Sequence, residues 1–165
     1  MMLYLCRHAA AADVGSDGTD ATRPLTAQGR RDFKRAMRGL ARLNVRFNCV
    51  LASPLTRAQQ TAEIMLRELG KHLPEKQSVI ISGSLAPPGR LDAFASELRG
   101  LAATATSVAA VGHEPMLSRW IGQICFNSPG RCLMKKGAIA AIDFDPRIGT
   151  GELEFLLQPR ALRKL

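Results

Sequence analysis

The segment Val50-Leu51-Ala52-Ser53-Pro54-Leu55-Thr56-Arg57 predicts the end of a buried strand followed directly by the start of a helix. Its apolar first half is typical of a strand that is covered on both faces of a sheet. Ser53 and Pro54 favour a helix start, with the serine as N-cap and the proline at the first helical position. Gly70 is well placed to end that helix. Arg57 is therefore expected in the first helical turn, close to the end of the strand.

Two other segments have the same design, in which a short apolar run is followed at once by polar residues. They are Leu3-Tyr4-Leu5-Cys6-Arg7-His8 and Ala109-Ala110-Val111-Gly112-His113-Glu114-Pro115. The carboxyl ends of parallel strands share one edge of a sheet, and ligands bind in the crevice there. The sequence therefore predicts one site built from four residues that are far apart in the chain: Arg7, His8, Arg57 and His113.

The rest of the chain also alternates between apolar runs and helical patterns. Thr26 can cap a helix over residues 27–43, and residues 91–101 predict another helix. Further strands are expected at residues 78–81, 107–111, 138–144 and 153–157, with a turn at 149–151. This alternation is typical of a three-layer α/β/α sandwich with a mostly parallel sheet, and it leaves the direction of the last two strands open. Since no linker divides the 165 residues, we expect one domain over residues 1–165.

The composition is that of an ordinary globular protein. Hydrophobic residues make up 46% of the chain and charged residues 22%. No apolar run approaches the roughly 20 residues of a membrane helix, so no membrane association is expected. Residues 1–7 lack the basic start of a signal peptide, and we expect a cytoplasmic location. Cys6 and Cys49 lie in apolar runs where thiols are usually buried, and the four cysteines imply no disulfide framework.

The four predicted site residues share an affinity for anions. Two guanidinium groups, two imidazoles and nearby helix N-termini favour a dianionic tetrahedral oxyanion such as a phosphoryl group. The sequence offers no acidic cluster for Mg²⁺, and His8 and His113 lack the third ligand that catalytic zinc needs. We therefore expect an anion site that works without a metal or other cofactor. The third histidine, His72, lies in a polar turn, and we interpret it as a solvent-exposed residue without a role.

Four motifs, in the same order along the chain, resemble those of the histidine phosphatase (phosphoglycerate mutase-like) superfamily. Cys6-Arg7-His8-Ala9 resembles its Arg-His-Gly signature, and Arg23-Pro24-Leu25-Thr26-Ala27-Gln28-Gly29 its Pro-Leu-Thr-x-x-Gly segment. Ser53-Pro54-Leu55-Thr56-Arg57-Ala58-Gln59-Gln60-Thr61-Ala62 is similar to its Ser-Pro-x-x-Arg-Ala-x-Gln-Thr-Ala block. Gly112-His113-Glu114-Pro115 resembles its second-histidine motif. The short chain and the Gly-His-Glu-Pro form are most similar to the SixA-type phosphohistidine phosphatases.

The resemblance implies a phosphoglycerate mutase-like fold and a covalent mechanism. His8 would attack the phosphorus atom and carry the phosphoryl group, while Arg7, Arg57 and His113 hold its oxygens. The expected substrate is phosphohistidine on a protein, such as a histidine-containing phosphotransfer domain in signal transduction. We expect the protein to be a monomer.

Two departures from the family pattern bear on the substrate. Ala9 replaces the glycine that lets the backbone approach the phosphate closely. Ser84 stands where many relatives carry a glutamate that protonates the leaving oxygen. An imidazole leaving from phosphohistidine needs less help than an alkoxide, so the missing acid favours phosphohistidine. Glu114 is a candidate substitute acid, although it equally suits a helix N-terminus as a favourable charge. Asp13 and Asp17 are weaker candidates.

Other functions stay open on the sequence alone. A small-metabolite phosphomonoesterase of the same superfamily would use the same residues, and kinetics on sugar phosphates would distinguish it. A mutase must enclose its substrate, and the chain has no long insertion for a lid. A non-catalytic phosphate-binding module on the same fold would form no phospho-His8 intermediate.

The net charge of +9 is concentrated on one predicted helix. Four basic residues recur there at four-residue intervals and form a basic stripe: Arg30, Lys34, Arg38 and Arg42. We interpret the stripe as a solvated helix face, with a docking surface for an acidic protein as the sharper alternative. Nucleic acid is a less favoured partner, since this region offers only Phe33 and Phe47 for base stacking.

Overall fold

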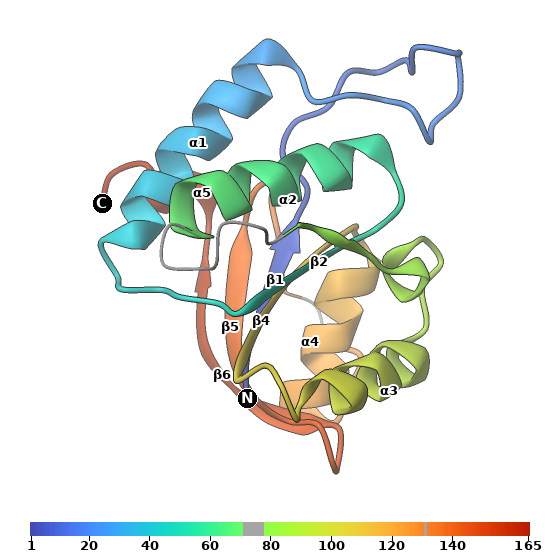
Figure 1. Cartoon of the computed structure of the whole chain (residues 1–165), viewed down its shortest axis with the longest axis vertical. Coiled ribbons are helices and arrows are strands. Elements are labelled where there is room, and N and C mark those ends of the chain that lie inside the picture. Colours follow the sequence, from blue (N-terminus) through green and yellow to red (C-terminus); the bar gives the residue numbers. More distant parts are fainter. Residues whose placement is uncertain (71–77, 131) are drawn as a thin grey trace.

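The computed structural model describes residues 1–70, 78–130 and 132–165, and His72 lies outside these described residues. In the described part, six strands form one sheet in the order β3-β2-β4-β1-β5-β6. The strands are β1 (Met2–Arg7), β2 (Cys49–Ala52), β3 (Ile80–Ile81), β4 (Ser107–Gly112), β5 (Ile139–Asp145) and β6 (Thr150–Leu157). The helices are α1 (Ala27–Ala41), α2 (Thr56–Leu69), α3 (Leu91–Leu101), α4 (Met116–Phe126), α5 (Pro159–Leu162) and the 3₁₀ turn η2 (Gly83–Leu85). Helices cover both faces of the sheet (Figure 1), which confirms the expected three-layer α/β/α sandwich.

The three strands that carry the predicted site are direct neighbours. β4 is parallel to both β1 and β2, in registers that pair Arg7 with Gly112 and Ala52 with Val111. Their carboxyl ends therefore lie side by side at one edge of the sheet. β5 is antiparallel to β1 and to β6, so the sheet is mixed and the direction of its last two strands is settled.

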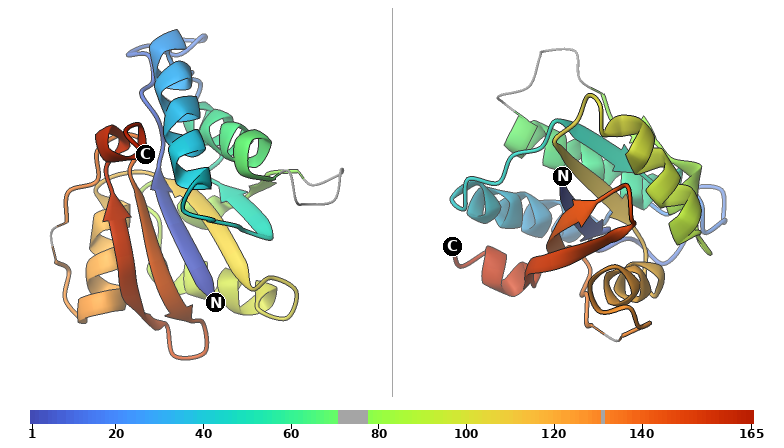
Figure 2. Two further views of the ribbon diagram at one scale, coloured as in Figure 1. Left: turned by 90° about the vertical axis from the view of Figure 1, so that its left-hand side faces the viewer. Right: turned by 90° about the horizontal axis from the view of Figure 1, so that it is seen from below.

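The central strands are buried on both faces, because side chains alternate along a strand. In β1, Tyr4 and Cys6 pack in the layer with α1 and α2, whereas Leu3 and Leu5 pack in the layer with α3 and α4. Figure 2 shows these two helical layers on opposite sides of the sheet. Cys6 and Cys49 are buried free thiols, as predicted. No helix in the described ranges is long and apolar enough to cross a bilayer.

The start of α2 differs from the prediction. The helix begins at Thr56 with Leu55 at the N-cap, so Ser53 is not the N-cap and Pro54 does not open the helix. The Ser53 hydroxyl accepts the Leu55 amide at 3.3 Å, but it also contacts His113 at the end of β4. This contact holds Ser53 at the end of the strand, three residues before the helix begins at Thr56.

Two strands also have other boundaries than predicted. β3 has two residues instead of four, and Ile80 and Ile81 are 45% and 49% exposed because this strand lies at an edge of the sheet. β6 begins at Thr150 and not at residue 153, because the turn before it is already closed by the Gly149 amide, which donates to the Asp145 carbonyl at 2.9 Å.

The start of α1 confirms a prediction and explains a glycine. The Thr26 hydroxyl accepts the Gly29 amide at 2.9 Å and so caps the helix, which ends at Ala41 instead of residue 43. The N-terminal end of α1 lies against the loop that follows β1. A Cβ atom at Gly29 would lie 2.2 Å from the carbonyl oxygen of Ala10 in that loop. The glycine of the Pro-Leu-Thr-x-x-Gly segment is therefore required by a close approach of two backbones. The single-turn helix α5 was not predicted.

Candidate active site

His8 follows directly after β1 and is 7% exposed. Its Nδ1 lies 2.8 Å from the carbonyl oxygen of Ala9. Because a carbonyl oxygen can only accept, Nδ1 carries the hydrogen and the lone pair of the neutral ring is on Nε2. The amide of Ala9 donates to the hydroxyl of Thr61 in α2 at 3.1 Å. The backbone after β1 thus fixes both the tautomer and the direction of His8.

His113 follows β4, and the centroid of its ring lies 5.1 Å from that of His8. Its Nε2 lies 2.8 Å from Oγ of Ser53, which already accepts the Leu55 amide. The serine hydrogen is therefore free to point at Nε2, which favours the tautomer with the hydrogen on Nδ1. That Nδ1 is buried and has no hydrogen-bond partner among the described residues.

Arg57 lies in the first turn of α2, as predicted, and is 6% exposed. Its Nη1 donates to the carbonyl oxygen of Asp20 at 2.7 Å, and its Nη2 donates to the Asp20 carboxylate at 2.9 Å. Arg23 donates to the other carboxylate oxygen at 2.7 Å. The loop between β1 and α1 therefore places a carboxylate on the guanidinium that the sequence assigns to a phosphoryl group.

Arg7 ends β1 and is half-buried. Its Nη1 donates to the carbonyl oxygen of Met134 at 2.7 Å, whereas its Nε is buried without a partner in the described part of the chain. Arg7 Nε and His113 Nδ1 are thus two buried nitrogen atoms that no described residue satisfies. Buried polar groups are nearly always satisfied in native structures, so such a pair indicates a place for an acceptor-rich ligand.

Burial keeps both histidines neutral. The pKa of His8 is lowered to about 4, first by burial and then by the positive charges of Arg57, Arg7 and Lys136. The pKa of His113 is lowered to about 3 by burial, by His8 and by the same two arginines. The structure therefore brings the four predicted residues into one electrostatic group. Nε2 of His8 is unprotonated at pH 7 and available as a nucleophile.

Further residues of the motifs hold this group in place. The Thr61 hydroxyl donates to the Arg57 carbonyl at 2.7 Å while it accepts the Ala9 amide. The side-chain oxygen of Gln60 accepts the Leu25 amide at 2.8 Å. Through Gln60 and Thr61, helix α2 is thus hydrogen-bonded both to the Pro-Leu-Thr-x-x-Gly segment and to the chain after β1.

Glu114, the candidate substitute acid, and Ser84, which stands where many relatives carry the acid, both have partners of their own. One oxygen of Glu114 accepts the Ser118 amide at 3.1 Å and the other accepts the Ser118 hydroxyl at 2.6 Å, so this carboxylate stabilises the start of α4. The Ser84 hydroxyl donates to Glu97 of α3 at 2.7 Å. Neither group is free to serve a leaving group in this arrangement.

Two residues near the site were missed in the sequence. Asp20 contacts the site arginine of α2, whereas Asp17 accepts hydrogen bonds within its own loop and Asp13 is exposed. Lys136 is close enough to lower the pKa of His8. Neither Asp20 nor Lys136 belongs to a motif. The loop between β1 and α1 has three aspartates, and no sequence pattern indicates that Asp20 is the one that binds Arg57.

The basic stripe is partly neutralised within the chain. Glu68 of α2 pairs with Lys34 at 3.3 Å and with Arg38 at 3.4 Å. Arg42 donates to the carbonyl oxygen of Leu165. Two of the four stripe charges therefore have a carboxylate partner, which favours the solvated-face interpretation over a docking surface.

Comparisons with known proteins agree with this geometry. A family model described as the histidine phosphatase superfamily (branch 1) matches residues 3–79. An uncharacterised protein of Picosynechococcus is 40% identical over 145 residues, which cover 86% of this chain and 84% of that protein. The phosphohistidine phosphatase SixA of Escherichia coli is 29% identical over 99% of this chain and 97% of its own length. A solved structure of the protein histidine phosphatase SixA with tungstate superimposes with a TM-score of 0.85 at 27% identity, covering 98% of this chain and 99% of that one.

Proposed function

The chain belongs to the histidine phosphatase superfamily, and from this premise we propose that it is a metal-independent phosphatase that removes the phosphoryl group from phosphohistidine on a protein. The observation that carries this proposal is the pairing of a neutral His8, whose Nε2 is free, with two unsatisfied buried nitrogen atoms beside it. An unprotonated nucleophile next to oxyanion donors is the arrangement that phosphoryl transfer requires.

In the first step, Nε2 of His8 attacks phosphorus and forms a P–N bond while the bond to the leaving group breaks. Nδ1 keeps its hydrogen and donates it to the Ala9 carbonyl oxygen, which stabilises the ring as it becomes positively charged. Arg7, Arg57 and His113 donate to the equatorial oxygens, where charge gathers in a loose transition state. Water then attacks the phospho-His8 phosphorus, which releases inorganic phosphate and restores neutral His8.

The carboxylates near the site bear on the leaving group. An alkoxide has to be protonated as it leaves, but Glu114 is bound by Ser118. The pKa of Asp20 is lowered by hydrogen bonds from Arg23 and Arg57, so that carboxyl group is ionised at pH 7. The imidazole of phosphohistidine can be protonated before it leaves, so it does not need an acid from the enzyme. This chemistry supports phosphohistidine over a phosphate ester.

The similarity to SixA supports the same substrate class. The Escherichia coli SixA protein is called a phosphohistidine phosphatase, and SixA was solved with tungstate, which is a tetrahedral oxyanion like phosphate. The three proposed donors to the phosphoryl oxygens, Arg7, Arg57 and His113, all donate through nitrogen, which binds an oxyanion directly. We therefore expect activity without an added metal.

The decisive experiment compares the wild type with His8→Ala on a phosphohistidine protein and on p-nitrophenyl phosphate, both in EDTA. The wild type should hydrolyse both substrates, with preference for the phosphohistidine protein, and the variant should be inactive. Brief exposure to ³²P-labelled substrate followed by acid-free denaturation should trap label on His8. Activity that needs an added metal, or label at another residue, would refute the mechanism.

A further inference from the structure

Hydrolysis of the phospho-His8 intermediate needs a group that takes a proton from the attacking water. His8 cannot take it, because Nε2 is the atom bound to phosphorus and Nδ1 already donates its hydrogen to the Ala9 carbonyl. His113 does not suit this role either, since its Nε2 faces the Ser53 hydroxyl and its Nδ1 donates to the phosphoryl group in the proposed mechanism. The base is therefore expected among the carboxylates around the site.

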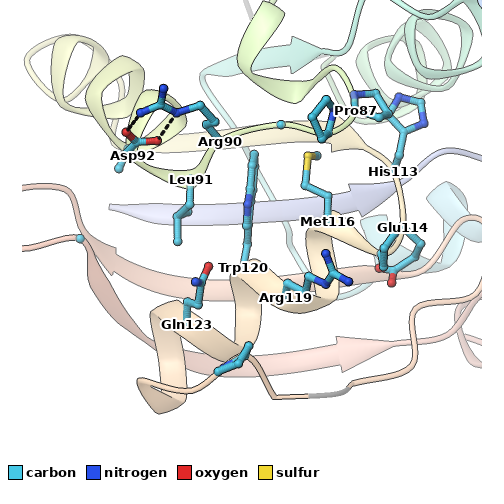
Figure 3. Close-up of a pocket in the computed structure, with 16 residues that line it drawn as sticks. Pro87, Arg90, Leu91, Asp92, His113, Glu114, Met116, Arg119, Trp120 and Gln123 are labelled. Atoms are coloured by element: carbon cyan, nitrogen blue, oxygen red, sulfur yellow. Dashed lines mark hydrogen bonds and ion pairs between the residues drawn. The ribbon is translucent and has the colours of Figure 1, made fainter.

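The carboxylates on the α4 side of His113 are held in other contacts. Glu114 and Asp92 line a pocket that opens beside His113. In Figure 3 the carboxylate of Glu114 points away from the His113 ring, and its two oxygens accept the amide and the hydroxyl of Ser118. Asp92 lies at the other end of the pocket, where dashed lines join it to Arg90 (Figure 3). Neither carboxylate is positioned to accept a proton at the phosphoryl group.

Asp20, in contrast, contacts one of the proposed donors to the phosphoryl oxygens. Its carbonyl oxygen accepts Nη1 of Arg57 at 2.7 Å, and its carboxylate accepts Nη2 at 2.9 Å. A guanidinium group has five hydrogens, and these two bonds use two of them. Arg57 can therefore bind Asp20 and a phosphoryl oxygen at the same time. The carboxylate of Asp20 would then lie beside the phosphoryl group.

Water can reach this carboxylate. The Asp20 side chain is 60% exposed, whereas His8 is only 7% exposed. One Asp20 oxygen accepts from Arg23 and the other from Arg57, which takes two of the roughly four acceptor positions of a carboxylate. In an in-line displacement, water attacks phosphorus on the face opposite Nε2 of His8. Because His8 is buried, that face is turned towards the solvent, which is the side on which Asp20 is exposed.

The charges that face Asp20 suit a base. They are the guanidinium groups of Arg23 and Arg57, whose hydrogen bonds lower the pKa of the Asp20 carboxyl group and keep it ionised at pH 7. Asp20 in turn raises the pKa of His113, against the positive charges that lower it. The carboxylate is thus electrostatically coupled to two of the three proposed donors.

We propose that Asp20 is the general base in the hydrolysis of phospho-His8. Asp20 takes one proton from the water while the water oxygen bonds to phosphorus. The P–N bond to His8 breaks, and its electron pair returns to Nε2. Asp20 then loses the proton to the solvent as inorganic phosphate leaves. The proposal rests on the proposed function and adds a catalytic residue to its second step.

The test separates the two steps in Asp20→Asn, with p-nitrophenyl phosphate as substrate. The asparagine keeps the backbone carbonyl and a side-chain oxygen for Arg57, but it cannot take up a proton from water at pH 7. The first step is measured as the burst of p-nitrophenolate, which leaves without an acid, and it should be no slower than in the wild type. The second step is the loss of ³²P from labelled enzyme after rapid removal of substrate. It should be about 100-fold slower, the low end for a general base, because a loose transition state has little bonding to water.

Two further variants make the result specific. Asp20→Glu keeps a carboxylate and should lose the label faster than Asp20→Asn. Asp17→Asn removes a charge from the same loop, but Asp17 accepts from Thr19, so both steps should match the wild type. A wild type that never carries label on His8 would overturn the proposed function itself. Label that leaves Asp20→Asn as fast as the wild type would overturn the base alone. Equal slowing of both steps would also overturn it, because Asp20 would then act only by orienting Arg57.

Discussion

The Asp20 carboxylate lies 2.9 Å from Nη2 of Arg57, and the carbonyl oxygen of the same residue lies 2.7 Å from Nη1. One residue of the first loop thus binds two nitrogens of the guanidinium that should receive the phosphoryl group. Hydrogen bonds from Arg23 and Arg57 keep the pKa of Asp20 below its usual value. An incoming phosphoryl group therefore meets an ionised carboxylate at this arginine, and has to displace it or share the donors.

Asp20→Asn should strengthen the binding of inorganic phosphate. The change removes a negative charge next to the anion site but keeps the shape of the side chain, so a dianion should bind about threefold to tenfold more tightly at low salt. The measurement is the competitive inhibition constant of phosphate against p-nitrophenyl phosphate, and the gain should shrink as salt is added. Asp17→Asn in the same loop is the control, since Asp17 accepts hydrogen bonds from Thr19 instead. Weaker phosphate binding in Asp20→Asn would show that Asp20 serves only to orient Arg57.

Ser53→Ala should lower kcat and leave KM nearly unchanged. The Ser53 hydroxyl lies 2.8 Å from Nε2 of His113 and favours the hydrogen on Nδ1, so its loss leaves the tautomer unset and a buried nitrogen without a partner. Because His113 then donates less often to the transition state, we expect about a tenfold loss in kcat, which is less than the loss of a whole oxyanion donor.

The control for this change is Ser82→Ala. Ser82 is as buried as Ser53 and donates to Glu97 at 2.6 Å, so the variant should lose comparable stability. It should keep its kcat, since its side chain is bonded to Ser84 and Glu97 and to neither site histidine. If both variants lose activity in proportion to their thermal stability, the tautomer role of Ser53 is wrong.

The sequence predicted the elements whose signals are local. Thr26 caps α1 as expected, and α3 has the predicted bounds of residues 91–101, because caps and apolar periodicity act within one or two turns. The start of α2 was predicted incorrectly because the Ser53 hydroxyl has a tertiary partner 60 residues away, and no local rule reports such a contact. β3 was predicted too long because its apolar residues lie at an exposed edge.

The same division holds for the site. The four predicted residues could be found because neighbouring strand ends share one edge of the sheet, a rule that needs only strand order and direction. The Asp20 contact and the position of Lys136 near His8 depend on how two loops fold. Neither position can be predicted from the apolar periodicity of the sequence.

Gly29→Ala should destabilise the fold at the approach of α1 to the chain after β1. An added Cβ would lie 2.2 Å from the Ala10 carbonyl oxygen, which is backbone and has to move with the segment that orients His8. We expect a loss of about 2–4 kcal/mol in the free energy of unfolding, together with a lower kcat. Gly100→Ala in α3 is the matched control, because no atom lies within 4 Å of its added Cβ and alanine is the better helix former. Urea denaturation of both variants decides. A Gly29→Ala protein as stable as the wild type would contradict the close approach.

Acidification should destabilise the protein before most carboxylates titrate. His8 and His113 have pKa values of about 4 and about 3 when folded, below the value of about 6.5 for a free histidine. As the pH falls from 6.5 towards 4, the unfolded chain binds protons that the folded site does not. The stabilisation by neutral histidines is therefore complete above pH 6.5 and is lost on the way down. We expect the free energy of unfolding to fall by about 2–4 kcal/mol between pH 7.5 and 5, and by less in His113→Gln. Nitrogen-15 NMR should show His8 neutral with its hydrogen on Nδ1 at pH 5.5, and a His8 ring that titrates near 6.5 would overturn the buried-nucleophile argument.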